Sequence, residues 1–423
     1  MAVRTAVWCS VVAWALYGWF LFPFVSGRDL APLLIAARLI HDGQSQHICD
    51  LDAARFAATS SVWMAEAEKV GVSGEVYPYV YPPLWAALLA PVSGVGLGAL
   101  RAVVTIVNLA ALGLVVLIVA ARWCPLLRRP LPLAVTLAAF FVSRPMIHGI
   151  LLGQLQPMVI ALVAVAMAES QRGMRREQGE PPEMRAWLAG GALALAAGLK
   201  LLPGVLAIYW AFTGRRRAAL WFAGGVAALA VASVVVAGWP AHVAYAQGLA
   251  RIGRSLLFTL NNQSLQSWVG SWVLPAAGGR MQEAPVWIRA LMAGVAVGGI
   301  AAAVVAGRRA RRANGRHDSA VGADAGQACA RADAAAMAAL ILIATITAPL
   351  AWAHYYAFLI VPALLLAQAR AYAVVAAVAV LASLPLNLAG VALARAGHGA
   401  LAWNELAAAV VCVATLNRQR NRQ

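Results

Sequence analysis

Long apolar runs separated by short arginine clusters constrain this chain more than any other feature. The first run, roughly residues 7–25, has about the ~20 residues that a helix needs to cross a bilayer. Of the 423 residues, 62% are hydrophobic and only 12% are charged, and the mean hydropathy is +0.76. These values exclude an ordinary soluble protein. They predict an all-α polytopic transmembrane protein with about 10–12 spans.

The net charge of +17 does not indicate a nucleic-acid partner. Only Lys69 and Lys200 are lysines, and most arginines fall in clusters between apolar runs, which is the positive-inside pattern of cytoplasmic loops. We therefore expect a multi-pass protein of the plasma (inner) membrane. The cytoplasmic clusters would be Arg122 with Arg128 and Arg129, Arg172 with Arg175, Arg176 and Arg185, residues 215–217, residues 308–316, and the tail at Arg418, Arg420 and Arg422.

The five cysteines are scattered without metal-binding spacing and indicate neither a metal site nor a disulfide framework.

Two long segments between the arginine clusters would lie outside the cytoplasm, at residues 26–81 and 238–285. The first contains two stretches that predict helices lying at the membrane interface, the second of them capped by Asp50 and anchored by Trp63. Residues 1–306 would form the main transmembrane module, 307–333 a flexible cytoplasmic linker, and 334–423 a group of C-terminal transmembrane helices.

Several apolar runs are interrupted by proline or glycine, which a bilayer tolerates only where protein or a water-filled cavity satisfies the backbone. Residues 186–212 lie between two arginine clusters, so an even number of passes must fit there. A hairpin turning near Lys200 to Pro203 meets this requirement and carries Lys200 to the outer side. Residues 131–169 would turn in the same way around "SRPMIHGILLGQLQP". The sequence does not decide whether residues 82–95 cross the bilayer or only enter it and return on the same side.

The polar residues of the apolar regions all map to the outer side. Ionisable residues at membrane depth are costly and usually line a functional cavity. A carboxylate, several cations and amide or hydroxyl donors suit a reaction that removes a proton from one partner and leaves negative charge on another. The residues are Asp29, Tyr81, Arg144, His148, Gln154, Lys200, Asn262, Gln263 and His354.

Six motifs in order resemble a known family. They are Asp29 after the first span with Asp42 and Gly43 downstream, "YVYPPLWAALLAPV", "GQLQPMVIALV", "AGLKLLPGVL", "NQS" and "APLAWAHYY". With these motifs, residues 1 to about 365 resemble the GT-C superfamily of polytopic glycosyltransferases, and in particular the mannosyltransferase-like glycosyltransferase family 87. The chain departs from the family pattern at Gln156 and around His354 and Tyr355, and these departures bear on the substrate.

The resemblance implies a GT-C fold that moves a hexose, mannose-like, from a polyprenyl-phosphate donor to a hydroxyl of a lipid or glycan acceptor. Transfer would occur on the extracytoplasmic side with inversion at the anomeric carbon. Asp29 would be the general base, and neither a metal nor another cofactor would be required. The donor phosphate would be bound by Lys200, Arg144, His354 and His148, and the substrates by Gln154, Asn262, Gln263 and Tyr81.

Each residue also has a structural interpretation. Asp29 could cap the helix that begins at Leu30, and Lys200 could snorkel to the interface. His354 and the tyrosines could form an aromatic belt, and the amides could cap helix turns. For the whole chain, the alternatives are a secondary transporter or lipid flippase, whose compact loops and internal repeats are not seen here, and a non-catalytic scaffold.

Overall fold

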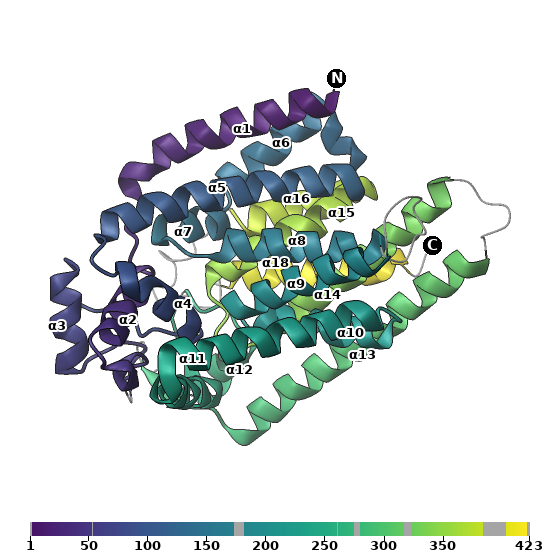
Figure 1. Ribbon diagram of the computed structural model, residues 1–423. Coiled ribbons are helices and arrows are strands. Elements are labelled where there is room, and N and C mark those ends of the chain that lie inside the picture. The colour runs from purple at the N-terminus through teal and green to yellow at the C-terminus, as the bar shows by residue number, and fades with distance from the viewer. Residues whose placement is uncertain are drawn as a thin grey trace.

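The computed structural model describes residues 2–52, 54–172, 182–259, 261–274, 280–316, 323–383 and 403–420. These residues form a bundle of helices, which confirms the predicted all-α polytopic class (Figure 1). Four helices of the described part are long and apolar enough to cross a membrane. They are α5 (Leu97–Arg122), α11 (Arg216–Arg254), α13 (Val286–Arg316) and α14 (Ala323–Thr347).

One bent pair, α7 (Arg144–Leu152) and α8 (Gln156–Arg172), meets the same test only when its two helices are taken together, and its bend of 118° is that of a broken span or of a re-entrant loop. By length and composition the described residues therefore give up to five spans, fewer than the expected 10–12, because other apolar runs form shorter helices. Those include α6 (Pro130–Phe141), α10 (Val205–Phe212), α15 (Ile360–Gln368), α16 (Tyr372–Leu381) and α18 (Asn404–Arg420). The first run forms α1 (Ala2–Leu21) and a short η1 turn (Phe22–Phe24).

The centre of the bundle is built on α8, which packs against α5 and against α9 (Pro182–Leu199). In turn, α9 packs on α11, and α13 packs on α14. Small residues allow the close approach that membrane helices use for packing, since a Cβ added at Gly225 of α11 would lie 2.8 Å from the Ala194 Cβ of α9.

The first long loop folds at one end of the bundle (Figure 1). It contains α2 (Ala31–His41), the short η2 turn (Ser45–His47) and α3 (Ser61–Lys69). Two expectations for this loop were wrong. The Trp63 side chain is fully buried rather than a surface anchor. Most of α2 is also buried, and its position at the membrane interface stays a prediction. Ser60, not Asp50, caps α3 by accepting from the Trp63 N–H.

Residues 82–95, whose path the sequence left open, do not cross. They form α4 (Pro83–Leu89) and the η3 turn (Ala90–Val92). With a rise of ~1.5 Å per residue, α4 is only about 10 Å long, a third of the apolar core of a bilayer. It packs instead on α2 and α11.

The second long loop is more structured than expected. Helix α11 continues past a kink at Gly238, whose φ of 77° is accessible to glycine, and ends at Arg254. Strand β1 (Ser255–Leu257) then pairs antiparallel with β2 (Met281–Glu283), with α12 (Leu265–Val273) between them.

The linker expected at 307–333 also differs from the structure, because α13 extends to Arg316 and α14 begins at Ala323. Asp333, within the expected linker, is buried and forms an ion pair of 2.5 Å with Arg215, which is buried too. Residues 317–322 and 384–402 lie outside the described part.

Candidate active site

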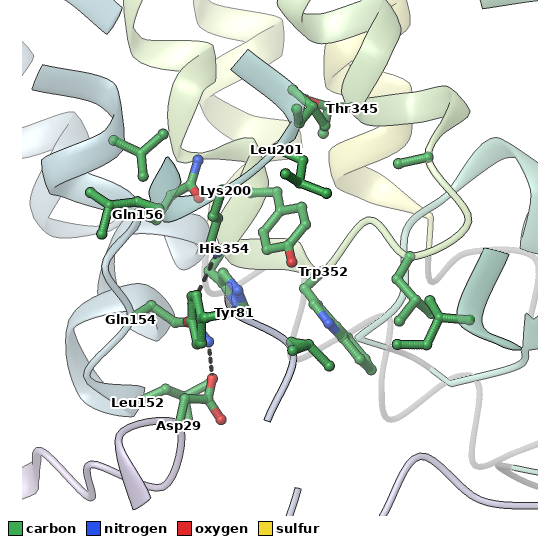
Figure 2. A pocket seen from close by; sticks show the side chains of 18 of the residues that line it. Asp29, Tyr81, Leu152, Gln154, Gln156, Lys200, Leu201, Thr345, Trp352 and His354 are labelled. Atoms are coloured by element: carbon green, nitrogen blue, oxygen red, sulfur yellow. Dashed lines mark hydrogen bonds between the residues drawn. The ribbon is translucent and has the colours of Figure 1, made fainter. Parts of the chain in front are cut away.

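A cavity of about 440 Å³ lies where the first loop meets the breaks between short helices. It brings together residues that are far apart in the sequence (Figure 2). Of the residues selected from the sequence, those that line it are Asp29, Tyr81, His148, Gln154, Lys200 and His354. Convergence of a carboxylate, an ammonium group and two imidazoles on one cavity is not required by helix packing, so this cavity is the candidate active site.

Asp29 is positioned by backbone contacts between its loop and the break that separates α7 from α8. The Ser26 N–H donates to the Leu151 carbonyl at 2.8 Å, and the Asp29 N–H donates to the Leu152 carbonyl at 3.1 Å. Gly153, with a φ of 74°, makes the turn that follows. A Cβ at Gly153 would lie 2.7 Å from Leu30 Cδ1, so only glycine permits both the turn and this close approach.

Gln154 connects the charged groups of the cavity through one carboxamide. Its Nε2–H donates to Asp29 Oδ2, and its Oε1 accepts from Lys200 Nζ and from the Tyr81 hydroxyl, each at 3.0 Å. Asn108 of α5 fixes the backbone of Gln154 by donating from Nδ2 to its carbonyl at 2.8 Å. All polar atoms of the Gln154 side chain are thus engaged by protein groups, which makes it a positioning residue of the site.

The surroundings of Asp29 make it more basic than a carboxylate in water. Removal from solvent raises the pKa of Asp29, and this effect outweighs the Gln154 hydrogen bond and the nearby charges of Lys200 and Arg28, which lower it. A carboxylate of raised pKa at the edge of a cavity is a suitable general base.

Lys200 reaches the cavity because α9 ends directly before it. The Trp85 indole N–H donates to the Gly198 carbonyl at 2.5 Å and so supports this helix end. The Lys200 ammonium lies 3.9 Å from the centroid of the Tyr355 ring, within the range of a cation–π contact. The helix is interrupted where the sequence predicted a hairpin turn, since α9 ends at Leu199 and the η5 turn (Leu202–Gly204) follows. The hairpin itself and the membrane side of Lys200 stay predictions.

Two histidines add unused hydrogen-bonding groups. His354 lies in the η6 turn (Ala353–Leu359) and is 2% exposed. Neither of its ring nitrogens has a partner among the described residues, and the same holds for His148 Nδ1. The two ring centroids are 6.1 Å apart. Buried polar atoms are normally satisfied, so these nitrogens are suited to a ligand that enters the cavity.

Three residues selected from the sequence do not line the cavity. Arg144 is buried in an ion pair of 2.7 Å with Glu405 of α18. Asn262 secures its own loop, because its Nδ2 donates to the Leu257 carbonyl at 3.0 Å and its Oδ1 accepts from the Ala351 N–H at 2.9 Å. Gln263 is also buried in this loop, where its backbone N–H donates to the Ala351 carbonyl.

The sequence instead missed neighbouring residues that do contribute. Asn261 lines the cavity and accepts from Arg144 Nη2 at 3.3 Å. Tyr355 lies beneath Lys200, and Asn108 holds Gln154. The "NNQS" stretch pointed to the correct loop but not to the residue that lines the cavity, and the "HYY" stretch gave His354 but not Tyr355. Asn108, an amide in the middle of a long apolar run, was the detectable signal that went unused.

The cavity also has aliphatic lining residues, which include Val163, Leu199, Leu202 and Ile341. A second cavity of about 270 Å³ adjoins it, lined by α10, α13 and α14 side chains, and the two share Leu202 and Ala348. The site therefore combines polar groups with aliphatic lining residues and is continued by a second, mostly apolar cavity. Within the described residues, no group of three or more His, Cys, Asp or Glu side chains is placed to hold a metal ion.

Comparison with known protein families gave one match. Residues 79–325, more than half of the chain, match the family model of glycosyltransferase family 87. No curated protein and no solved structure matches the chain. The matched region includes Tyr81, His148, Gln154 and Lys200, whereas Asp29 and His354 lie outside it.

Proposed function

The chain belongs to glycosyltransferase family 87 and is a glycosyltransferase, and we propose that it moves a mannose-like hexose from a polyprenyl-phosphate donor to an acceptor hydroxyl. The reaction would take place on the extracytoplasmic face of the plasma (inner) membrane. The observation that carries this proposal is the Gln154 carboxamide, which joins a potential base, Asp29, to a potential phosphate ligand, Lys200, in one cavity.

The proposed step is a single displacement with inversion. Asp29 removes the proton from the acceptor hydroxyl while the hydroxyl oxygen attacks the anomeric carbon of the donor sugar. The bond between that carbon and the phosphate oxygen breaks, and the electron pair leaves with the phosphate. The products are the glycosylated acceptor, protonated Asp29 and a polyprenyl monophosphate.

The leaving phosphate gains one negative charge in this step, since a phosphodiester becomes a monoester. Lys200 offers a cation for that charge, and the imidazoles of His354 and His148 offer N–H donors with unused bonding capacity. Groups already aimed at the position where charge develops stabilise the transition state more than the ground state.

The aliphatic lining residues support the proposal of a polyprenyl chain. Its isoprene units would occupy the aliphatic region near Leu199 and Leu202 and the adjoining cavity between α10, α13 and α14. The donor phosphate would remain at the depth of Lys200. The tail is too apolar to leave the bilayer, so its binding site has to extend among membrane helices.

The proposal is tested with the purified chain in liposomes supplied with synthetic polyprenyl-phosphate mannose and a glycolipid extract from a strain lacking the gene. Mass spectrometry should detect an acceptor that gains one hexose with wild type and not with Asp29→Asn. The same acceptor should lack this hexose in the deletion strain. Equal transfer by the two proteins would overturn the role of Asp29, and transfer only from a nucleotide-linked sugar would overturn the donor.

A further inference from the structure

Three aromatic side chains form one wall of the cavity, and the proposed reaction assigns them no role. They are Phe56 and Tyr77 of the first loop and Trp352, directly before η6; we term them the aromatic wall. The Phe56 ring lies 6.2 Å from Tyr77 and 5.2 Å from Trp352, measured between centroids. All three side chains are partly exposed, so a ligand in the cavity can contact their faces.

Polar groups border the aromatic wall. The Arg28 guanidinium lies 5.7 Å from the centroid of the Tyr77 ring and donates to the Glu75 carbonyl at 3.4 Å. Asn261 and the carboxylate of Asp29 line the same cavity. The wall and its neighbours therefore combine flat apolar faces with hydrogen-bonding groups, whereas other lining residues, such as Val163, Leu199 and Ile341, are aliphatic.

This difference separates two kinds of ligand. An isoprenoid chain has no hydroxyl groups and is accommodated by aliphatic side chains alone. A pyranose ring has an apolar C–H face and an edge of hydroxyls, so it needs an aromatic face together with polar partners. The aromatic wall has the second composition, and the carboxylate that must reach the acceptor hydroxyl lines the same cavity.

We infer that the aromatic wall is the acceptor subsite and that it binds a saccharide ring, so the acceptor is a sugar rather than the hydroxyl of an aliphatic lipid. This inference rests on the proposed function and specifies its acceptor. The ring stacks on the wall and presents one hydroxyl to Asp29. A free glycan and a glycolipid headgroup share this chemistry, and the test distinguishes them.

Saccharide binding is measured without donor, by saturation-transfer NMR on the chain in lipid nanodiscs. The probes are methyl α-mannopyranoside, a free saccharide, and mannosyl-dioleoylglycerol, a glycolipid, with dioleoylglycerol as the sugar-free control. We expect saturation of sugar C–H protons by the wild type and a dissociation constant about fivefold higher in Tyr77→Leu and Phe56→Leu. Leucine keeps the bulk of the side chain, and an unchanged melting temperature verifies folding.

Trp272→Leu is the matched control, because Trp272 is 67% exposed and does not line the cavity. It should leave binding unchanged. Tighter binding of the mannosyl lipid than of the methyl glycoside would identify a glycolipid acceptor, and equal binding a free glycan. Absence of sugar saturation in the wild type, or equal binding by wild type and the Tyr77 and Phe56 variants, would overturn the subsite.

Failure of the subsite can be distinguished from failure of the proposed function. If the sugar binds and the variants weaken it while no polyprenyl-linked donor is used, the subsite stands and the donor assignment fails. If transfer proceeds and the acceptor KM is the same in wild type and Tyr77→Leu, the proposed function stands and the subsite fails.

Discussion

Asp29 and Gln154 lie 125 residues apart in the sequence and share a hydrogen bond, with the carboxamide donating to the carboxylate. The same carboxamide accepts from Lys200, so the geometry of three functional groups depends on the break between α7 and α8. A continuous helix could not supply this turn, because Gly153 adopts a left-handed conformation there. The broken span is therefore the element that assembles the site.

Replacing Asp29 with asparagine should abolish transfer and leave the fold intact. Asparagine retains an oxygen that accepts from Gln154 but lacks the basicity that removes the acceptor proton. We expect kcat to fall by about 10²–10⁴-fold, as for other general bases, with little change in donor affinity. Steady-state kinetics on the purified protein measure both. Asp42→Asn, at the exposed end of α2, is the control and should retain full activity.

The pH dependence of transfer should report the raised pKa of Asp29. Since burial raises this pKa and a general base acts only when deprotonated, activity should fall as the pH drops through a value above the ordinary aspartate range. The acidic limb of the pH profile is the range in which activity falls as the pH drops. In Gln154→Glu, a second carboxylate beside Asp29 should shift this limb to a pH about one unit higher, because two adjacent carboxylates resist ionising together.

The measurement for Gln154 is kcat/KM across the pH range, compared with Gln44→Glu. Gln44 is exposed and does not line the cavity, so the added charge there should not move the limb. An acidic limb at the same pH in Gln154→Glu and wild type would refute the coupling between Gln154 and Asp29.

Features that depend on local sequence were predictable. Proline and glycine marked the breaks at Gly153 and Lys200 to Pro203, and Lys200, a lysine within an apolar run, lines the cavity. That the arginine clusters share one side of the membrane stays a prediction. Asp29 was identified by its position after the first span. These inferences need only the cost of exposing backbone and charge in a bilayer.

Features that depend on tertiary contacts were not predictable. A helix with few charges looks the same whether it lies at an interface or in a core, so the burial of α2 and Trp63 was missed. Adjacent amides in one loop have the same local signature, and only the fold places Asn261 in the cavity and turns Asn262 into the loop. Arg144 meets its partner Glu405 across 261 residues.

The topology is tested separately from the chemistry. Reporters inserted after Arg217 and after Arg316 should read cytoplasmic, because both follow arginine clusters. Reporters within residues 26–81 should read extracytoplasmic, as should reporters within 238–285. Cysteine labelling from the outside of intact cells provides an independent readout. An extracytoplasmic signal at Arg217 would refute the orientation proposed for the active site.

Lys200→Ala should weaken donor binding, whereas Asp29→Asn should slow the chemical step with the donor still bound. The donor phosphate is negatively charged before the reaction, so removing the Lys200 ammonium should weaken donor binding. The loss of stabilisation should be larger in the transition state, where the leaving phosphate gains further negative charge. We expect the donor Kd to rise at least about tenfold. Binding of polyprenyl-phosphate mannose to protein in nanodiscs measures this without turnover.

The chain contains a matched control, because its only other lysine, Lys69, has a side chain that is 54% exposed and pairs with Glu66 in the first loop. Lys69→Ala should bind donor normally. If Lys200→Ala also binds donor normally, Lys200 holds Gln154 in place without touching the phosphate, and the donor site must lie elsewhere in the cavity.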